Sequence, residues 1–187
     1  FPAKVAAYVG SGQYGDATAS EVHPYAWALA EAQRRGNRRA VAALCAVGPP
    51  PHTQEQLWTE RMWVTRLEGG MRPRALWKLA RATLGAPESS ILSVRSAMRG
   101  FRFSIDAMWD EVARLNLFEA VPALQMPVFF FLGRHDHWVP PQAAVTYLDA
   151  LSAPSKQLVW FEHSGHEPFV DEPETFNAAM TALVRPV

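Results

Sequence analysis

Apolar and polar residues follow different patterns in different parts of the chain. A short apolar, β-prone run, "VAAYVG" (5–10), ends at a Gly-Ser-Gly and predicts a buried strand that runs into a tight loop. From Ser20 to about Phe118, apolar residues recur every three or four positions between Gly and Pro stops, and Thr53 and Ser104 are typical helix caps. We therefore expect an all-helical block of roughly 100 residues in this region.

The last third of the chain alternates strand and helix signals. "MPVFFFLG" (126–133) is an apolar run that is too short for a helix and typical of a strand buried on both faces of a parallel sheet. A helix that begins at a proline (141–151), a second buried strand (156–162) and a closing helix (172–184) follow it. This order predicts an α/β fold in which helices cover a parallel sheet. Three two-sided strands make a thin sheet, so we expect neighbouring strands to be missing from it.

The composition narrows the classes of partner and the compartment. Lysine plus arginine and aspartate plus glutamate number 18 each, so the net charge is zero and no overall field favours nucleic acid or an anionic membrane. No apolar run approaches the roughly 18 residues needed to span a bilayer. Cys45 is the only cysteine, which excludes an intramolecular disulfide and fits a reducing compartment. The sequence thus predicts a cytoplasmic protein with neither a nucleic-acid nor a membrane partner.

Two residues that can share a proton follow neighbouring strands. Asp136 comes just after the first buried strand of the last third, and His166 comes just after the second. Functional side chains of open α/β sheets gather beyond the carboxyl ends of the strands, and the 30 residues between these two match one strand-helix-strand crossover. A carboxylate in this place fixes the tautomer of an imidazole and stabilises the imidazolium. Asp136 and His166 are therefore our candidate catalytic acid and base, although an aspartate before a proline-rich loop is also typical of a plain turn.

Three segments carry a family resemblance. "VGSGQ" (9–13), "WDEVARLNLFEAVPALQMPVFFFLGRHD" (109–136) and "SGHEPFVDEP" (164–173) resemble the C-terminal part of the α/β-hydrolase fold family, and in particular its proline iminopeptidase-like serine hydrolases. The resemblance extends over essentially the whole chain. It implies that Asp136 and His166 are the acid and the base of a catalytic triad.

The same resemblance implies a division of the chain into two parts. Residues 1–17 and 119–187 would form the C-terminal part of the α/β-hydrolase core, with parallel strands and covering helices. Residues 18–118 would form an inserted all-helical cap, or lid, above the active site.

The chain lacks the nucleophile motif of this family. Serine hydrolases of this fold carry the nucleophile in a G-x-S-x-G elbow that precedes the acid and the base, and no such elbow occurs here. Ser11 in "VGSGQ" lacks the outer glycines and follows what we interpret as the next strand along. Because the chain opens "FPAKV" without an initiator methionine, we expect it to be cut from a longer protein, with the elbow about 20 residues upstream of Phe1. The chain alone is then expected to be inactive.

Other side chains give less specific signals for chemistry. His163 competes with His166 for the role of base. His135 and His137 share a face in an extended segment, but a third, separated ligand is not evident, so we expect no metal site. No organic cofactor is implied by the resemblance. Ordinary solvated helix positions are expected for Glu60 and Glu68, although an aminopeptidase would need a cap carboxylate to hold the α-amine of its substrate.

We expect structural roles for the tryptophans and arginines of the helical block. Four tryptophans recur at helical positions and are expected mainly in the core: Trp58, Trp63, Trp77 and Trp109. The four arginines of "RRGNRR" (34–39) are expected in a solvated turn between two helices.

The sequence therefore predicts the cap and C-terminal portion of a serine hydrolase that cleaves an ester or amide bond, with an N-terminal peptide bond as the subgroup's suggestion. Its partners would be a small-molecule ester, amide or short peptide substrate, and the N-terminal half of the same hydrolase or a second copy at the exposed sheet edge. Two alternatives stay open. A haloalkane dehalogenase or epoxide hydrolase would use the same fold with an aspartate nucleophile, and a truncated or degenerate chain would bind a partner without catalysis.

Overall fold

Three parallel strands form the sheet, in the order β1-β2-β3. The computed structural model describes residues 4–70, 72–87 and 90–185, so the predicted core residues 1–3, with Phe1, lie outside the described residues. The strands are β1 (Tyr8–Ser11), β2 (Val128–Gly133) and β3 (Lys156–Phe161). The α/β fold class and the parallel sheet are confirmed.

The first strand is shorter than the sequence predicts. It pairs with β2 from Tyr8 opposite Val128, and the Tyr8 amide donates a hydrogen bond to the Pro127 carbonyl at 2.9 Å. Because β2 begins only at Val128, the residues before Tyr8 have no partner strand in the described part of the chain. The predicted start at Val5 is therefore wrong, and the strand runs on to Ser11 instead. The predicted burial is also wrong, since Gly10 is the one buried residue of β1.

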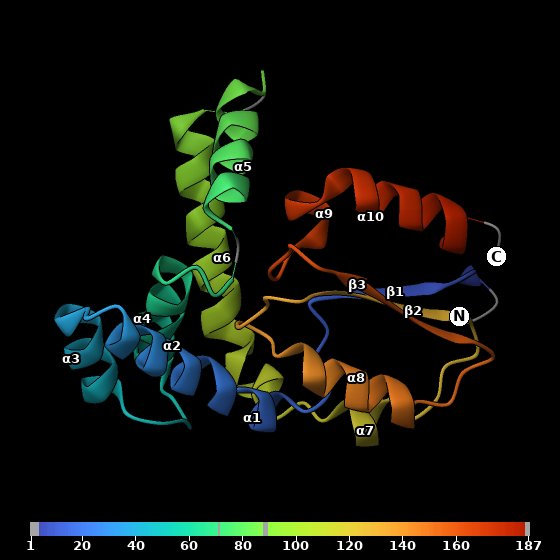
Figure 1. Cartoon of the computed structure of the whole chain (residues 1–187), viewed down its shortest axis with the longest axis horizontal. Helices are drawn as coiled ribbons and strands as arrows, with labels where there is room; N and C mark the ends of the chain where they lie inside the picture. Colours follow the sequence, from blue (N-terminus) through green and yellow to red (C-terminus); the bar gives the residue numbers. More distant parts are fainter. Residues whose placement is uncertain (1–3, 71, 88–89, 186–187) are drawn as a thin grey trace.

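The central strand β2 is buried along its whole length, as its apolar run predicts. Its side chains alternate between two cores. On one face Phe130 packs against α8 (Pro141–Ala150) and residues of α7 (Leu117–Ala120). On the other face Phe131 packs against α10 (Pro173–Ala179) and the following π-helical turn η2 (Met180–Val184), which α9 (Pro168–Asp171) precedes. Figure 1 shows these two helical layers on either side of the sheet.

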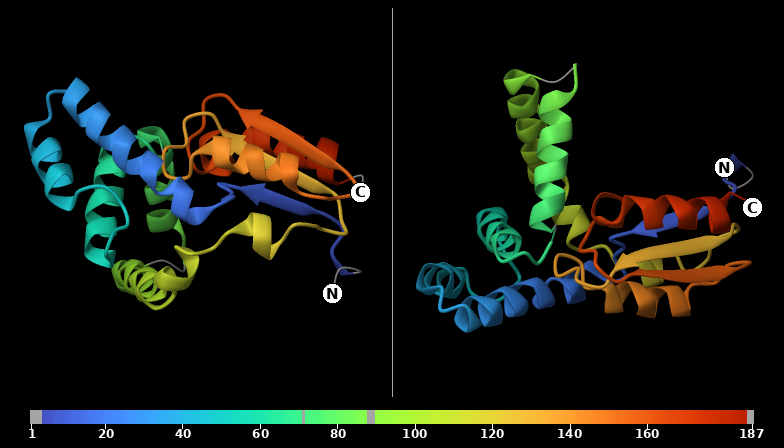
Figure 2. Two further views of the ribbon diagram at one scale, coloured as in Figure 1. Left: turned by 90° about the horizontal axis from the view of Figure 1, so that it is seen from below. Right: turned by 45° about the horizontal axis from the view of Figure 1, so that its top comes forward.

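The segment between β1 and β2 is helical, as predicted. Its helices before α7 are α1 (Ala17–Ser20), α2 (Val22–Arg34), α3 (Arg38–Val47), α4 (Gln54–Arg66), α5 (Pro73–Gly85) and α6 (Ile91–Val112). Helices α2, α3 and α4 share a core of their own, centred on Leu44, Trp63 and Val64. Helix α5 and the first part of α6 instead project from this core (Figures 1 and 2), although α5 contacts α9 and Phe101 of α6 packs edge-on against Trp58 of α4. Among the described helices, none is long and apolar enough to cross a membrane.

Local signals set most helix ends, with two corrections. Thr53 begins α4 with a capping box, as predicted, and the "RRGNRR" segment forms the turn between α2 and α3. Ser104 is not a cap, because α6 starts at the cap Ser90 and continues through Gly100. A single glycine costs a helix only about 1 kcal/mol, so it does not end one by itself. Trp77 is 61% exposed, so its predicted core position is wrong, whereas Trp63 is buried.

Candidate active site

The structure brings Asp136 and His166 together at one edge of the sheet. Asp136 follows β2 and His166 follows β3, and these strands pair in parallel up to Gly133 opposite Phe161. Nδ1 of His166 lies 2.8 Å from Oδ2 of Asp136, which is hydrogen-bond distance. Asp136 is only 3% exposed. The pair therefore has the contact that the sequence predicts for an acid and a base.

The second oxygen of Asp136 holds the carboxylate in place. Oδ1 accepts hydrogen bonds from the backbone amides of Trp138 and Val139, both at 2.9 Å. This is the local turn that an aspartate before a proline-rich loop is known to form. The turn uses Oδ1 and the contact with His166 uses Oδ2, so one carboxylate makes both sets of hydrogen bonds.

Glycines allow the His166 ring to be closely surrounded. Gly12, which follows β1, has φ +58°, and a Cβ atom there would run into the His166 imidazole. On the other side the Trp138 ring lies 5.3 Å from the imidazole, centroid to centroid. Gly12 in the turn after β1 therefore leaves room for the His166 ring because it has no side chain.

The linker between α4 and α5 bonds to both site loops. The Gly69 carbonyl accepts a hydrogen bond from the His137 amide at 2.7 Å, and the Gly70 carbonyl accepts one from the His166 amide at 3.1 Å. A Cβ atom at Gly70 would lie 2.7 Å from the Trp138 ring. The helical segment is thus fixed to the loops that carry Asp136 and His166.

Asp136 sets the protonation chemistry of His166. Burial alone lowers the pKa of the imidazole, but the hydrogen bond and the negative charge of Asp136 outweigh it and raise the pKa of His166 above its ordinary value of 6.5. Because Asp136 binds Nδ1, Nε2 is the ring nitrogen that can take a proton from a nucleophile.

The other histidines of the prediction lie elsewhere. His137 stacks on Trp27 of α2 with ring centroids 4.2 Å apart, and its Nδ1 lies 3.1 Å from Nε2 of His23. Burial and the neighbouring His23 lower the pKa of His137 to about 4, so it is a neutral contact between the site loop and α2. His163 is exposed. Among the described residues, no group of three possible metal ligands is present around His135 or elsewhere.

Ser11 gives no contact that would mark it as a nucleophile. It is the exposed last residue of β1, and in the described part of the chain no hydrogen bond joins its side chain to His166.

A buried charged cluster lies near this pair, and sequence reasoning missed most of it. Arg61 on α4 donates hydrogen bonds to Glu21 at 2.5 Å and to Glu60 at 2.7 Å. Glu60 is completely buried, so its predicted solvated position is wrong, whereas Glu68 is exposed at a positive φ of 71° after α4. The burial of Glu60 could have been predicted from its spacing, because Glu60 lies three residues after the buried Leu57 and shares its helix face.

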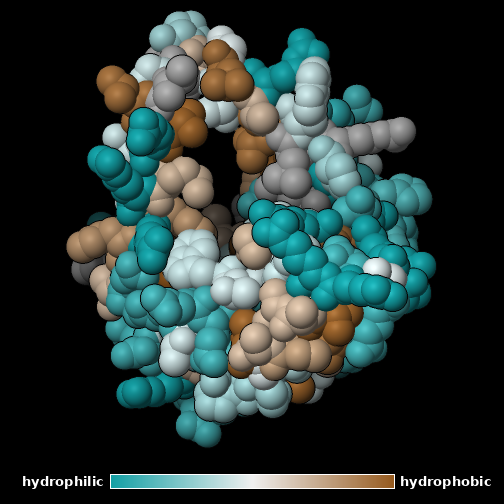
Figure 3. Space-filling view, turned by 90° about the vertical axis from the view of Figure 1, so that its left-hand side faces the viewer, coloured by the Kyte–Doolittle hydropathy of each residue, from teal (hydrophilic) through white to brown (hydrophobic). Residues whose placement is uncertain are grey.

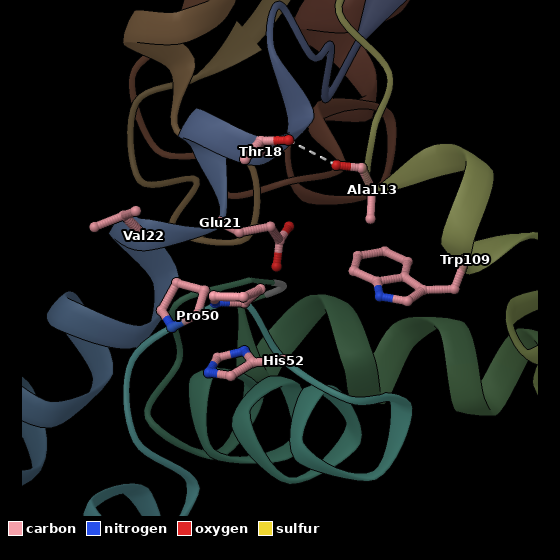
Figure 4. A pocket seen from close by; sticks show the side chains of 8 residues that line it. Thr18, Glu21, Val22, Pro50, His52, Trp109 and Ala113 are labelled. Carbon is pink, nitrogen blue, oxygen red and sulfur yellow. Dashed lines mark hydrogen bonds between the residues drawn. The ribbon is translucent and has the colours of Figure 1, made fainter.

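A cavity of about 220 Å³ borders this cluster. Figure 4 shows the Glu21 carboxylate pointing into it, opposite the Trp109 ring and beside His52. A hydrogen bond of 2.9 Å from the Thr18 hydroxyl to the Ala113 carbonyl joins α1 to the end of α6 at its rim. The cavity is mostly apolar, with Glu21 as its acidic group.

The buried carboxylate of Glu60 makes stability depend on pH. Burial raises its pKa to about 7, and its Oε1 has no hydrogen-bond partner among the described residues. Between pH 4.5 and 7 the folded state then binds more protons than the unfolded state, so this group makes the free energy of unfolding fall as the pH rises. We expect Glu60→Gln to reduce this fall, measured by urea unfolding at several pH values. The exposed Glu68→Gln is the control, and an equal effect of both substitutions would contradict the prediction.

Comparisons with known proteins agree with this fold. No family model matches the chain. It is 35% identical over 142 residues to the protein named probable aminopeptidase YbaC of Bacillus subtilis (strain 168), a match that covers 74% of this chain and 45% of YbaC. It is 39% identical over 74 residues to AB hydrolase superfamily protein YclE of the same organism, covering 39% of this chain and 26% of YclE. The solved structure of an alpha/beta fold family hydrolase from Bacillus anthracis str. Sterne matches 94% of this chain and 57% of that chain, with a TM-score of 0.54 and 18% identity.

The fold, the place of the Asp136–His166 pair and these matches define the class of protein. The chain belongs to the α/β-hydrolase fold family. It spans less than half the length of the two Bacillus subtilis relatives that it matches.

Proposed function

We propose that this chain supplies the acid and the base of a serine α/β-hydrolase that cleaves an ester or amide bond. The observation that carries the proposal is the 2.8 Å contact between Nδ1 of His166 and Oδ2 of Asp136 at the ends of two neighbouring parallel strands. In open α/β sheets this edge is where ligands bind. The match to a protein named probable aminopeptidase supports amide hydrolysis, with an N-terminal peptide bond as the substrate.

In the proposed mechanism His166 acts twice. Its Nε2 takes the proton of a serine hydroxyl as that oxygen attacks the substrate carbonyl, and gives the proton to the leaving group. Water then attacks the acyl-serine, and Nε2 takes a proton from this water and returns it to the serine oxygen. Asp136 keeps the proton of the imidazole on Nδ1 and stabilises the imidazolium. Backbone amides of the oxyanion hole stabilise the tetrahedral intermediate, each by about 3 to 4 kcal/mol.

The nucleophile and the oxyanion hole are proposed to lie upstream of this chain. In the described part of the chain β1 pairs on one side only, with β2, so its other edge is able to pair with a further strand. The N-terminal half of the same hydrolase is the proposed partner at this edge. Residues 18–118 are the proposed cap, and their glycine linker at Gly69 and Gly70 touches both site loops.

The charged cluster supports the aminopeptidase version of this function. Glu21 and Glu60 share the single charge of Arg61, so the cluster carries excess negative charge whenever both carboxylates are ionised. Glu21 also reaches the cavity beside α1. We assign Glu21, and not Glu60 or Glu68, as the group that holds a substrate α-amine.

A covalent probe tests the proposal. The full-length protein is treated with a fluorophosphonate, which reacts with an activated serine, and the labelled peptide is found by mass spectrometry. We expect a label on a serine in a G-x-S-x-G elbow upstream of residue 1, and no label on residues 1–187 alone. A label on Ser11 would overturn the proposal.

The same protein also tests the two alternatives. A single turnover in ¹⁸O-labelled water that places ¹⁸O in an aspartate at the elbow would identify the haloalkane dehalogenase or epoxide hydrolase chemistry. A full-length protein that has no elbow and takes up neither label would leave the non-catalytic interaction chain.

A further inference from the structure

Helices α5 and α6 carry a large apolar surface that is open to solvent. Leu92 is 75% exposed, Phe103 73% and Trp77 61%. The other exposed apolar side chains of the two helices are Leu79, Leu84, Met98, Phe101 and Met108. Figure 3 shows hydrophobic side chains around an opening in the upper part of the molecule, where Figure 1 places these two helices. A large exposed set of apolar side chains marks an interaction surface of the protein.

The charges of the chain are separated in space although they cancel in total. Residues 72–103 contain seven lysines and arginines and one acidic residue, Glu88. The rest of the chain therefore has 11 basic and 17 acidic residues. The acidic residues of α6 all lie in its final two turns, starting at Asp106, where α6 returns to the body of the molecule (Figure 1). The net charge of zero is therefore the sum of a basic arm, which is the part of α5 and α6 within residues 72–103, and an acidic body, which is the rest of the chain.

The apolar and basic side chains lie next to each other on the helices. Leu92 and Phe103 are eleven residues apart and share a face of α6. Arg95, Arg99 and Arg102 follow at spacings of four and three along the adjoining face. On α5 the Arg81 guanidinium lies 4.8 Å from the centre of the exposed Trp77 ring.

We propose that this arm, residues 72–87 and 90–103, docks on an anionic lipid surface. Helices that lie in a bilayer interface combine lysine and arginine with tryptophan, phenylalanine and leucine, which is the combination found here. The basic side chains would bind the negative headgroups while the apolar side chains enter the boundary with the acyl chains. The acidic body would be repelled by the same surface, so the molecule would approach with the arm first.

Charge complementarity favours lipid over a second copy of the chain. Two copies that met through their arms would bring Arg95, Arg99 and Arg102 of one copy toward the same residues of the other, and like charges repel. A nucleic acid would satisfy the arginines but would leave Leu92, Phe103 and Leu84 without an apolar partner. An anionic bilayer satisfies both kinds of side chain.

Vesicle binding by the full-length protein tests this proposal. The protein is sedimented with vesicles of phosphatidylcholine alone and of phosphatidylcholine mixed with phosphatidylglycerol, at low and high salt. We expect binding to the mixed vesicles that weakens with salt. The double reversal Arg95→Glu, Arg99→Glu should lower the affinity by more than about tenfold. The exposed pair Arg38 and Arg39 on α3 gives the matched control, since Arg38→Glu, Arg39→Glu should leave binding unchanged.

Two further variants test the apolar contribution. Leu92→Ser with Phe103→Ser should also lower the affinity, and both positions are exposed, so the fold should be unaffected. Brominated lipid should quench part of the tryptophan fluorescence, and Trp77→Phe should remove that quenching while binding persists. Failure to bind mixed vesicles would overturn the proposal, and so would binding that ignores the serine substitutions, which would indicate a purely electrostatic contact. A lipid-free dimer that Phe103→Ser dissociates would identify a second copy as the true occupant.

Discussion

Replacing His166 with alanine is expected to lower kcat/KM of the full-length hydrolase by at least about a thousandfold. In the proposed mechanism, the substitution removes the base that takes the serine proton and the acid that protonates the leaving group. Only 23% of the His166 side chain is exposed, and it lies next to the buried Asp136. A water molecule from the solvent would not be held in the same position, so it could not act as the base in place of His166. Hydrolysis of a chromogenic ester or aminoacyl amide at saturating and limiting substrate measures the effect.

Two other histidines give matched controls for this measurement. His163 lies on the same loop but is exposed, and His163→Ala should change kcat/KM by less than about twofold, as surface substitutions generally do. His137 contacts Trp27 and His23, so His137→Ala should affect stability more than turnover. If His137→Ala abolished activity while His166→Ala left it intact, the assignment of the base would be refuted.

Local sequence signals were sufficient for the parts of the fold that meet at the site. The strands β2 and β3 could be located because each contains an apolar run that ends at a polar turn. The predicted burial of β3 is wrong, however, because Lys156 and Gln157 are exposed and only Phe161 is fully buried. The crossover rule then placed the residues after the two strands side by side, and the structure has Asp136 and His166 in contact. The contact between Asp136 and His166 could be predicted because the position of each residue is fixed by the strand that directly precedes it.

Features that depend on packing between distant segments could not be predicted in the same way. Glu21 and Arg61 are 40 residues apart and meet only because α4 packs against α2 and the turn before it. The spacing of apolar residues indicated that Trp77 lies on a helix, but not that α5 stands away from the core. Likewise, the total charge of zero gave no sign that the basic residues gather on one arm.

Asp136→Asn is expected to lower kcat by about 10⁴-fold while the fold stays intact. The backbone amides of Trp138 and Val139 require an oxygen at Oδ1, so the new NH2 group must take the position of Oδ2 and face Nδ1 of His166. Since an NH2 group donates, Nδ1 must then accept, and the ring proton moves to Nε2. Nε2 is the nitrogen that should take the serine proton, so the imidazole would be in the wrong tautomer for catalysis.

The same substitution has a second readout that does not depend on activity. In the native chain the hydrogen bond and charge of Asp136 raise the pKa of His166 against the opposing effect of burial. Without Asp136, burial is the largest remaining effect on the pKa of His166, Arg61 acts in the same direction, and only the smaller effect of the Glu167 charge opposes them, so the pKa should fall below 6.5. NMR titration of the imidazole checks the direction, and its ¹⁵N shifts report the tautomer. In the intact hydrolase, kcat/KM should correspondingly lose activity as the pH falls through a value above 6.5, because only neutral His166 is a base. An unchanged pKa and tautomer in Asp136→Asn would show that Asp136 serves only its turn, and the proposed triad would lose its acid.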